Sequence, residues 1–139
     1  WFCTHRLALH VWPELESHGN QYLRYALGLD PDIPRNSPAH RAANDVAVTV
    51  EVLRAGLDAA RTLWPGIATV GELIEKVDQP ALLHRIPFKL SDYMLFENAD
   101  RAFLNWIIDR GAGGPDCVYT AQYWLDYRLS PELPDDIPF

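Results

Sequence analysis

The sequence predicts a mainly α-helical chain with at most one short β-hairpin. Its longest helical signal covers residues 36–61, where apolar residues recur every three or four positions and form a stripe along about six helical turns. Shorter segments on both sides repeat this spacing and begin with residues that favour helix starts. A strand pattern occurs around residues 85–96, and residues 1–3 could form the end of another strand.

Two short helices should precede the long one. The first should run from a capping Thr4 to Val11, because Pro13 cannot continue it. The second should cover residues 20–27, with Gly28 as its C-cap. The residues expected to be buried are Leu7, Ala8 and Val11 in the first helix and Tyr22, Leu23, Ala26 and Leu27 in the second.

The long helix should begin with Ser37 as its N-cap and Pro38 as its first residue. The stripe expected to face a core consists of Ala42, Val46, Val50, Leu53, Leu57 and Ala60.

The same helix carries His40 and Asp45, an ionisable pair five residues apart. At about 100° per residue these side chains point roughly 140° apart, so they should not bind one ion together. They suit two separate tasks, in which the carboxylate holds a metal and the imidazole takes a proton from water. On spacing alone, both residues also fit an ordinary helix surface.

Trp64, Pro65 and Gly66 mark a boundary, since the helical pattern stops and two helix breakers follow. A helix over residues 69–77 should then start with a capping box formed by Thr69 and Glu72. Its inward residues should be Leu73, Ile74 and Val77.

Beyond this helix, residues 85–90 and 93–96 could pair as a hairpin. A helix opened by Asn98 or Asp100 should run to Arg110, and Asp116 should cap a final helix. The inward residues expected here are Phe103, Leu104, Ile107 and Ile108, then Val118, Tyr119, Tyr123, Trp124 and Leu125. Residues 130–139 form a Pro-rich acidic tail, which should be loosely ordered.

The composition fits a modest globular piece, with 139 residues of which 48% are hydrophobic. The net charge of −7 argues against a protein that coats nucleic acid through a basic face. Cys3 and Cys117 lack zinc-like spacing, so both should be buried or half-buried free thiols in a reducing cytoplasm. No apolar run approaches the roughly 18 residues that span a bilayer, so no membrane partner is expected.

The stretch HRAANDVAVTVEVL, from His40 to Leu53, resembles the last motif of the DEDDh 3′→5′ exonucleases. The preceding FCTHRLALHVWPELESHGNQYLRYALGL resembles the segment before this motif in exodeoxyribonuclease X-like proteins. Both blocks occur in the family's order and cover about the first 60 residues. The resemblance implies that this part belongs to an RNase H-like α/β exonuclease domain.

The resemblance implies a role for each matching residue. His40 would be the general base that activates water, and Asp45 the last of four acidic ligands of two Mg²⁺ or Mn²⁺ ions. Arg41 and Arg35 could contact a phosphate, although solvated loop charges are the alternative for both. The substrate would be the 3′ end of a nucleic acid, with single-stranded DNA expected.

The other three acidic ligands of the family precede the Cys-Thr pair, and no Asp or Glu occurs here before Glu14. The chain is therefore expected to be the C-terminal part of a longer enzyme and to be inactive alone. Residues 1–65 would end the exonuclease domain, residues 66–129 would form a small accessory domain, and residues 130–139 the tail.

The accessory region also resembles a module that follows some exodeoxyribonuclease X-like nuclease domains, through ALLHRIPFKL, AFLNWIIDRG and YTAQYWL. Here SDYMLFEN replaces the basic stretch that normally follows the Pro-Phe pair. Its aromatic residues could stack on bases or form the core, and the core is favoured. These residues are Tyr93, Phe96, Trp106, Tyr119 and Trp124.

Two alternatives remain open. The chain could be a non-catalytic helical domain that binds a protein partner through its acidic surface and its Trp- and Tyr-rich C-terminal helices. It could also be a pseudo-nuclease that keeps the fold without the acidic ligands.

Overall fold

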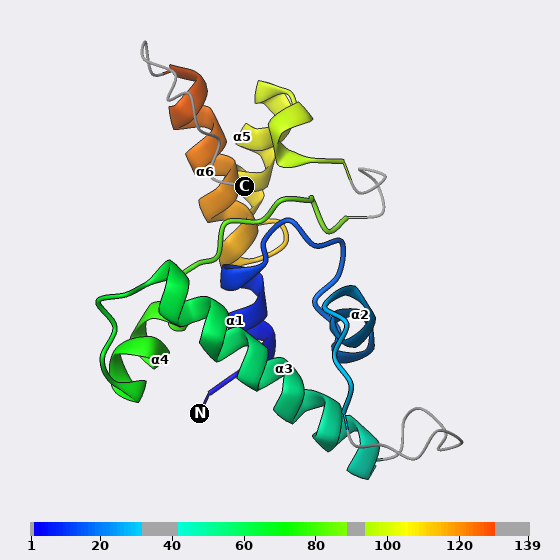
Figure 1. Ribbon diagram of the computed structural model, residues 1–139. Helices are drawn as coiled ribbons and strands as arrows, with labels where there is room; N and C mark the ends of the chain where they lie inside the picture. The colour runs from blue at the N-terminus through cyan, green and yellow to red at the C-terminus, as the bar shows by residue number, and fades with distance from the viewer. Residues whose placement is uncertain (1, 32–41, 89–93, 130–139) are drawn as a thin grey trace. The chain divides into compact units, whose positions relative to one another are not determined.

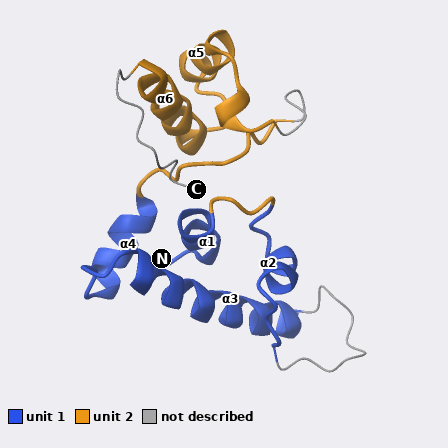
Figure 2. Ribbon diagram, turned by 45° about the horizontal axis from the view of Figure 1, so that its top comes forward, with its two compact units in different colours: residues 1–12, 17–78 blue, residues 13–16, 79–139 orange. Residues whose placement is uncertain are grey.

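A computed structural model describes residues 2–31, 42–88 and 94–129 (Figure 1). These residues are mainly helical, as the sequence predicts, and contain no strand longer than a single bridge. The elements in chain order are α1 (Thr4–Val11), α2 (Asn20–Ala26), α3 (Ala42–Leu63), α4 (Val70–Asp78), the 3₁₀ helix η2 (Phe96–Asn98), α5 (Arg101–Arg110) and α6 (Pro115–Leu129). They belong to two compact units: unit 1 contains residues 1–12 and 17–78, and unit 2 contains residues 13–16 and 79–139 (Figure 2).

In unit 1, α1 and α2 pack against the long helix α3, and α4 packs against α1 (Figure 2). Leu7 of α1, Ala60 of α3 and Val77 of α4 meet in its core. The close approach of α1 to α3 depends on Gly56, where an added Cβ would lie 2.7 Å from Cδ2 of Leu7. Glycine therefore lets the two helices touch at this point.

The predicted core stripe of α3 is wrong in its first half. Val46 and Val50 are 62% and 39% exposed, and Ala42 is also exposed. The buried residues of α3 are Asn44, Val48, Val52, Gly56 and Ala60, which recur at intervals of four. The reason is that α1 and α2 contact α3 along the side that carries these buried residues. This side contains Asn44 and Gly56, so its apolar pattern in the sequence is weaker than that of the predicted stripe.

The two short helices match the predictions closely. Leu7 and Ala8 are buried and Val11 is half-buried, but α1 has Cys3 at its N-cap, so Thr4 is its first residue. Helix α2 ends one residue early, at Ala26, and Gly28 follows with a φ of +63°. Ala26 is exposed against expectation, since α2 is so short that one turn, around Leu23, supplies its buried contact.

Helix α4 has the predicted capping box. The Thr69 hydroxyl accepts a hydrogen bond from the Glu72 amide at 3.2 Å, and the Glu72 carboxylate accepts from the amides of Ala68 and Thr69, each at 2.9 Å. At the other end, Arg6 Nε donates to the Val77 carbonyl at 3.1 Å. Because α4 is held against α1 in this way, the compact units divide after Asp78 instead of after Pro65.

Glu72 should titrate below its usual pKa of 4.5, because the backbone amides of Ala68 and Thr69 and the Thr69 hydroxyl all stabilise the carboxylate. A depressed pKa contributes stability to α4 that is present above the unfolded value and lost as pH falls through the folded one. A carbon-detected NMR titration should give a midpoint below 4.5. Thr69→Ala should move this midpoint part of the way back; a midpoint indifferent to that change would rule out the hydroxyl's contribution.

In unit 2, α5 and α6 pack together, with η2 against α6. Asp100 caps α5 as predicted, accepting from the Phe103 amide at 2.7 Å. Gly111 ends α5 in the left-handed region with a φ of +60°. Ile86, Phe96, Leu104, Ile107 and Trp124 are among the buried residues of its core.

Asp116 does not cap α6, because the helix already starts at Pro115. Instead its carboxylate accepts a hydrogen bond from the Ala81 amide at 2.7 Å. One turn later, the buried Thr120 hydroxyl accepts from the Leu83 amide at 2.9 Å and donates to the Asp116 carbonyl at 2.7 Å. Two polar side chains of α6 thus hold the backbone of residues 81–83.

The predicted hairpin is reduced to one antiparallel bridge between Arg85 and Leu95, flanked by hydrogen bonds from the Ile86 amide to the Met94 carbonyl and from the Phe96 amide to the His84 carbonyl. Residues 89–93 and the tail, 130–139, lie outside the described residues. Arg128 of α6 fixes the chain after this bridge, donating to the carbonyls of Glu97 and Ala99.

The aromatic set divides between core and surface. Phe96 and Trp124 are buried, as the core interpretation predicts, whereas Trp106 and Tyr119 are 42% and 46% exposed. Tyr119 was expected to face inward on α6, but that side consists of Cys117, Thr120, Ala121, Trp124 and Leu125. Tyr93 lies outside the described residues.

Candidate functional site

Asp45 lies near the start of the described part of α3, where this helix faces α2. Its side chain is half-buried, and Oδ1 lies 3.4 Å from the side-chain amide nitrogen of Gln21, which donates to it. The Thr49 hydroxyl donates to the Asp45 carbonyl at 2.7 Å and accepts from Asn20 Nδ2 at 2.6 Å. Two polar residues of α2 therefore fix the first turns of α3 around Asp45.

Buried apolar residues accompany these polar contacts between α2 and α3. Leu23 of α2 and Val48 of α3 are fully buried, and Asn44 is buried beside Asp45 in sequence. Asn20, Gln21 and Thr49 were not predicted from the sequence as partners of Asp45. The available signal was weak: two amide side chains at a helix start and a threonine four residues after the aspartate.

His40, Arg41 and Arg35 lie outside the described residues, so their roles stay predictions. Within residues 2–31, 42–88 and 94–129, no three side chains of His, Cys, Asp or Glu are grouped so that they could hold a metal ion. Asp45 offers one carboxylate, and a two-metal centre needs several. The described residues therefore do not by themselves fit the implied pair of Mg²⁺ or Mn²⁺ ions.

The cysteines are both free, as predicted, but only Cys117 is buried. Burial, with a smaller effect of the neighbouring Asp116 charge, raises the pKa of the Cys117 thiol to about 11. Since the thiolate is the reactive form, Cys117 is unsuited to act as a nucleophile near neutral pH. Cys3 is exposed, against the prediction, because it precedes α1 on the outside of the unit.

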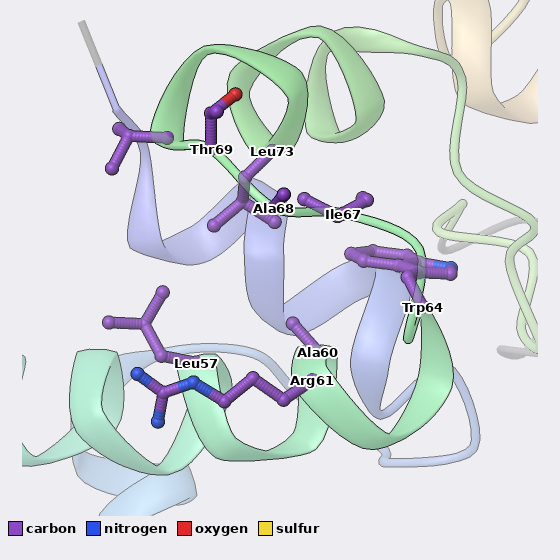
Figure 3. Close-up of a pocket in the computed structure, with 9 residues that line it drawn as sticks. Leu57, Ala60, Arg61, Trp64, Ile67, Ala68, Thr69 and Leu73 are labelled. Carbon is purple, nitrogen blue, oxygen red and sulfur yellow. The ribbon is translucent and has the colours of Figure 1, made fainter.

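A shallow apolar hollow of about 150 Å³ lies in unit 1 between the end of α3 and the start of α4 (Figure 3). It is lined by Leu57, Ala60, Arg61, Trp64, Ile67, Ala68, Thr69, Val70 and Leu73. Arg61 is paired with Asp58 at 2.6 Å, and the Lys76 ammonium lies 5.5 Å from the centre of the Trp64 ring. The lining contains no carboxylate, imidazole or thiol, so the hollow is suited to binding an apolar group and not to acid–base chemistry.

Among the described helices, none combines the length and the apolar character needed to cross a bilayer. No protein-family model, no curated protein and no solved structure matches this chain.

Proposed function

We propose that the chain is part of a metal-dependent 3′→5′ exonuclease of the DEDDh group, acting on the 3′ end of single-stranded DNA. The proposal starts from the likeness of the two blocks before and around Asp45 to that family. The observation that supports it most is the environment of Asp45, whose half-buried carboxylate is held at a helix interface by the Gln21 amide. A metal ligand needs this kind of support to keep its orientation.

In this proposal Asp45 supplies one carboxylate of the metal centre, and His40 takes a proton from the attacking water. The sequence predicts His40 in the first turn of the long helix, where the positive end of the helix dipole disfavours the protonated form of an imidazole. Arg35 and Arg41 would contact the phosphate backbone of the substrate. The remaining carboxylates would come from a part of the protein that precedes residue 1.

The interaction-domain alternative has one observation in its favour. Val46 and Val50, on the helix that carries Asp45, are exposed apolar side chains with no covering element among the described residues. A nuclease can carry such a surface as well, so the two functions are separated by an activity measurement.

The first test is the coding sequence upstream of Trp1. An Asp-x-Glu on an apolar strand, followed by another Asp shortly before Cys3, should be found there. The protein encoded by the complete frame should then shorten 5′-labelled single-stranded DNA stepwise from its 3′ end with Mg²⁺ or Mn²⁺, and EDTA should stop the reaction. A frame without these acids, or a complete protein that leaves the DNA intact, would reject the proposal in favour of the interaction domain.

A further inference from the structure

One side of α3 carries a seam with the seven-residue repeat of helix–helix interfaces. The α3 seam consists of Ala43, Val46, Val50, Leu53, Leu57 and Ala60 of α3 and Trp64 directly after the helix, separated alternately by three and four positions. An apolar repeat of 3.5 residues is the pattern that keeps one helix facing another along its length. In the second half of the seam Ala60 is buried in the core of unit 1, and Leu53, Leu57 and Trp64 are half-buried against that core. In the first half, Val46 and Val50 are exposed.

The α3 seam contains both a projection and a hollow. Val46 projects from its first half, and Leu57, Ala60 and Trp64 line the hollow at its second half. Val46 and Leu57 are eleven residues apart, which places them within about 20° of each other around the helix axis. When one half of a surface is complementary to its other half, two copies of the molecule can bind through this surface about a twofold axis. Each contact between the two halves then occurs twice.

We propose that the α3 seam is a dimerisation surface that binds the α3 seam of a second copy in antiparallel orientation. Val46 then packs against Leu57 of the second copy at the mouth of the hollow, and Val50 packs against Leu53. In both contacts an exposed valine of one copy meets a half-buried leucine of the other, and Val46 closes the mouth of the hollow. The inference does not depend on the nuclease proposal.

The charges beside the α3 seam fit the same arrangement. Glu51 pairs with Arg54 at 2.5 Å, and Asp58 pairs with Arg61 at 2.6 Å, so acids and bases alternate along this flank. Arg54 is largely exposed, and in an antiparallel pair it comes close to Glu51 of the second copy. Opposed helix directions also bring unlike ends of the two helix dipoles together.

The oligomeric state of the whole chain tests the proposal, measured by light scattering and sedimentation over a concentration series. The native chain should have twice the 15.8 kDa mass of one copy at high concentration. Val46→Asp and Val50→Asp should each raise the dimer dissociation constant at least tenfold, with an unchanged circular dichroism spectrum because both side chains are exposed. Leu63→Asp is the matched control, since Leu63 is 52% exposed on the same helix but lies about 100° away from Val46.

Cross-linking tests the orientation, in chains that also carry Cys3→Ser. Chains with Val46→Cys mixed with chains with Leu57→Cys should form a mixed disulfide on oxidation, and Val46→Cys chains alone should not link. Arg54→Glu should weaken the dimer, and Glu51→Arg combined with Arg54→Glu should restore it. Three results would each overturn the proposal. They are a native chain with the mass of one copy at every concentration, a dimer whose dissociation constant is unchanged by Val46→Asp and Val50→Asp, and disulfide-linked dimers of Val46→Cys chains alone.

Discussion

Asp45→Asn in the complete protein should reduce 3′→5′ exonuclease activity by more than about a hundredfold. Substitution of residues that only support a metal ligand can already lower activity by about that factor, and Asp45 is proposed to be a ligand itself. The amide keeps an oxygen that can accept from Gln21 Nε2, so the contact between α2 and α3 should survive. It removes the negative charge that a hard divalent cation requires. The measurement is the initial rate of release of 3′ nucleotides, with thermal unfolding as the check on the fold.

Asp58→Asn is the matched control for this experiment. Asp58 lies on the same helix, its side chain is 74% exposed, and its one described ion pair is with Arg61. Its replacement should leave the rate within about twofold of the native value, since an exposed ion pair contributes little. Equal losses from both substitutions would show that any charge change on α3 suffices, and Asp45 would lose its assigned role.

Gly113→Ala should destabilise unit 2 by about 2–5 kcal/mol, the largest effect on folding that we expect from a single added methyl group. Gly113 has a φ of +75°, where alanine costs roughly 1–2 kcal/mol. Its new Cβ would also collide with Sγ of Cys117 and would lie 2.8 Å from two ring carbons of Phe88. Overpacking of this kind typically costs about 1–3 kcal/mol more.

Gly114→Ala separates the two causes. Gly114 has a φ of +80° and no heavy atom within 4 Å of the added Cβ, so only the backbone cost of roughly 1–2 kcal/mol should appear. Hydrogen exchange reports each unit in the same chain: Gly113→Ala should increase exchange in α5 and α6 more than Gly114→Ala does, and α3 should keep its protection. Similar exchange for both variants would mean that residues 88 and 117 move aside at little cost.

Local signals in the sequence predicted most helix boundaries. The capping box of α4 joins Thr69 to Glu72, and the cap of α5 joins Asp100 to Phe103, so each bond forms between residues three positions apart. Such contacts can be inferred from neighbours in the chain. The mainly α-helical class followed from them and from the helical spacing of the apolar residues.

Contacts between distant residues could not be predicted in the same way. Asp116 looked like a helix cap, but it binds the amide of Ala81, 35 positions away. The buried line of α3 depends on where α1 and α2 cross it, and Gly56 marks that crossing without adding an apolar signal. The partner of Asp45, Gln21, lies on another helix, and only the packing of α2 on α3 brings them together.

Residues 13–16 belong to unit 2, although residues on both sides of them belong to unit 1. Glu16 pairs with Arg85 at 3.6 Å, and Arg85 leaves the ribosome long after Glu16. During synthesis, residues 13–16 therefore cannot make their native contacts until the later residues of unit 2 have been made. Bringing Glu16 and Arg85 together closes the long loop between them, which carries an entropic cost. For the same reason, a truncation after residue 78 would separate residues 13–16 from the rest of their unit, so shortened versions of the protein cannot be designed with a single cut between the two units.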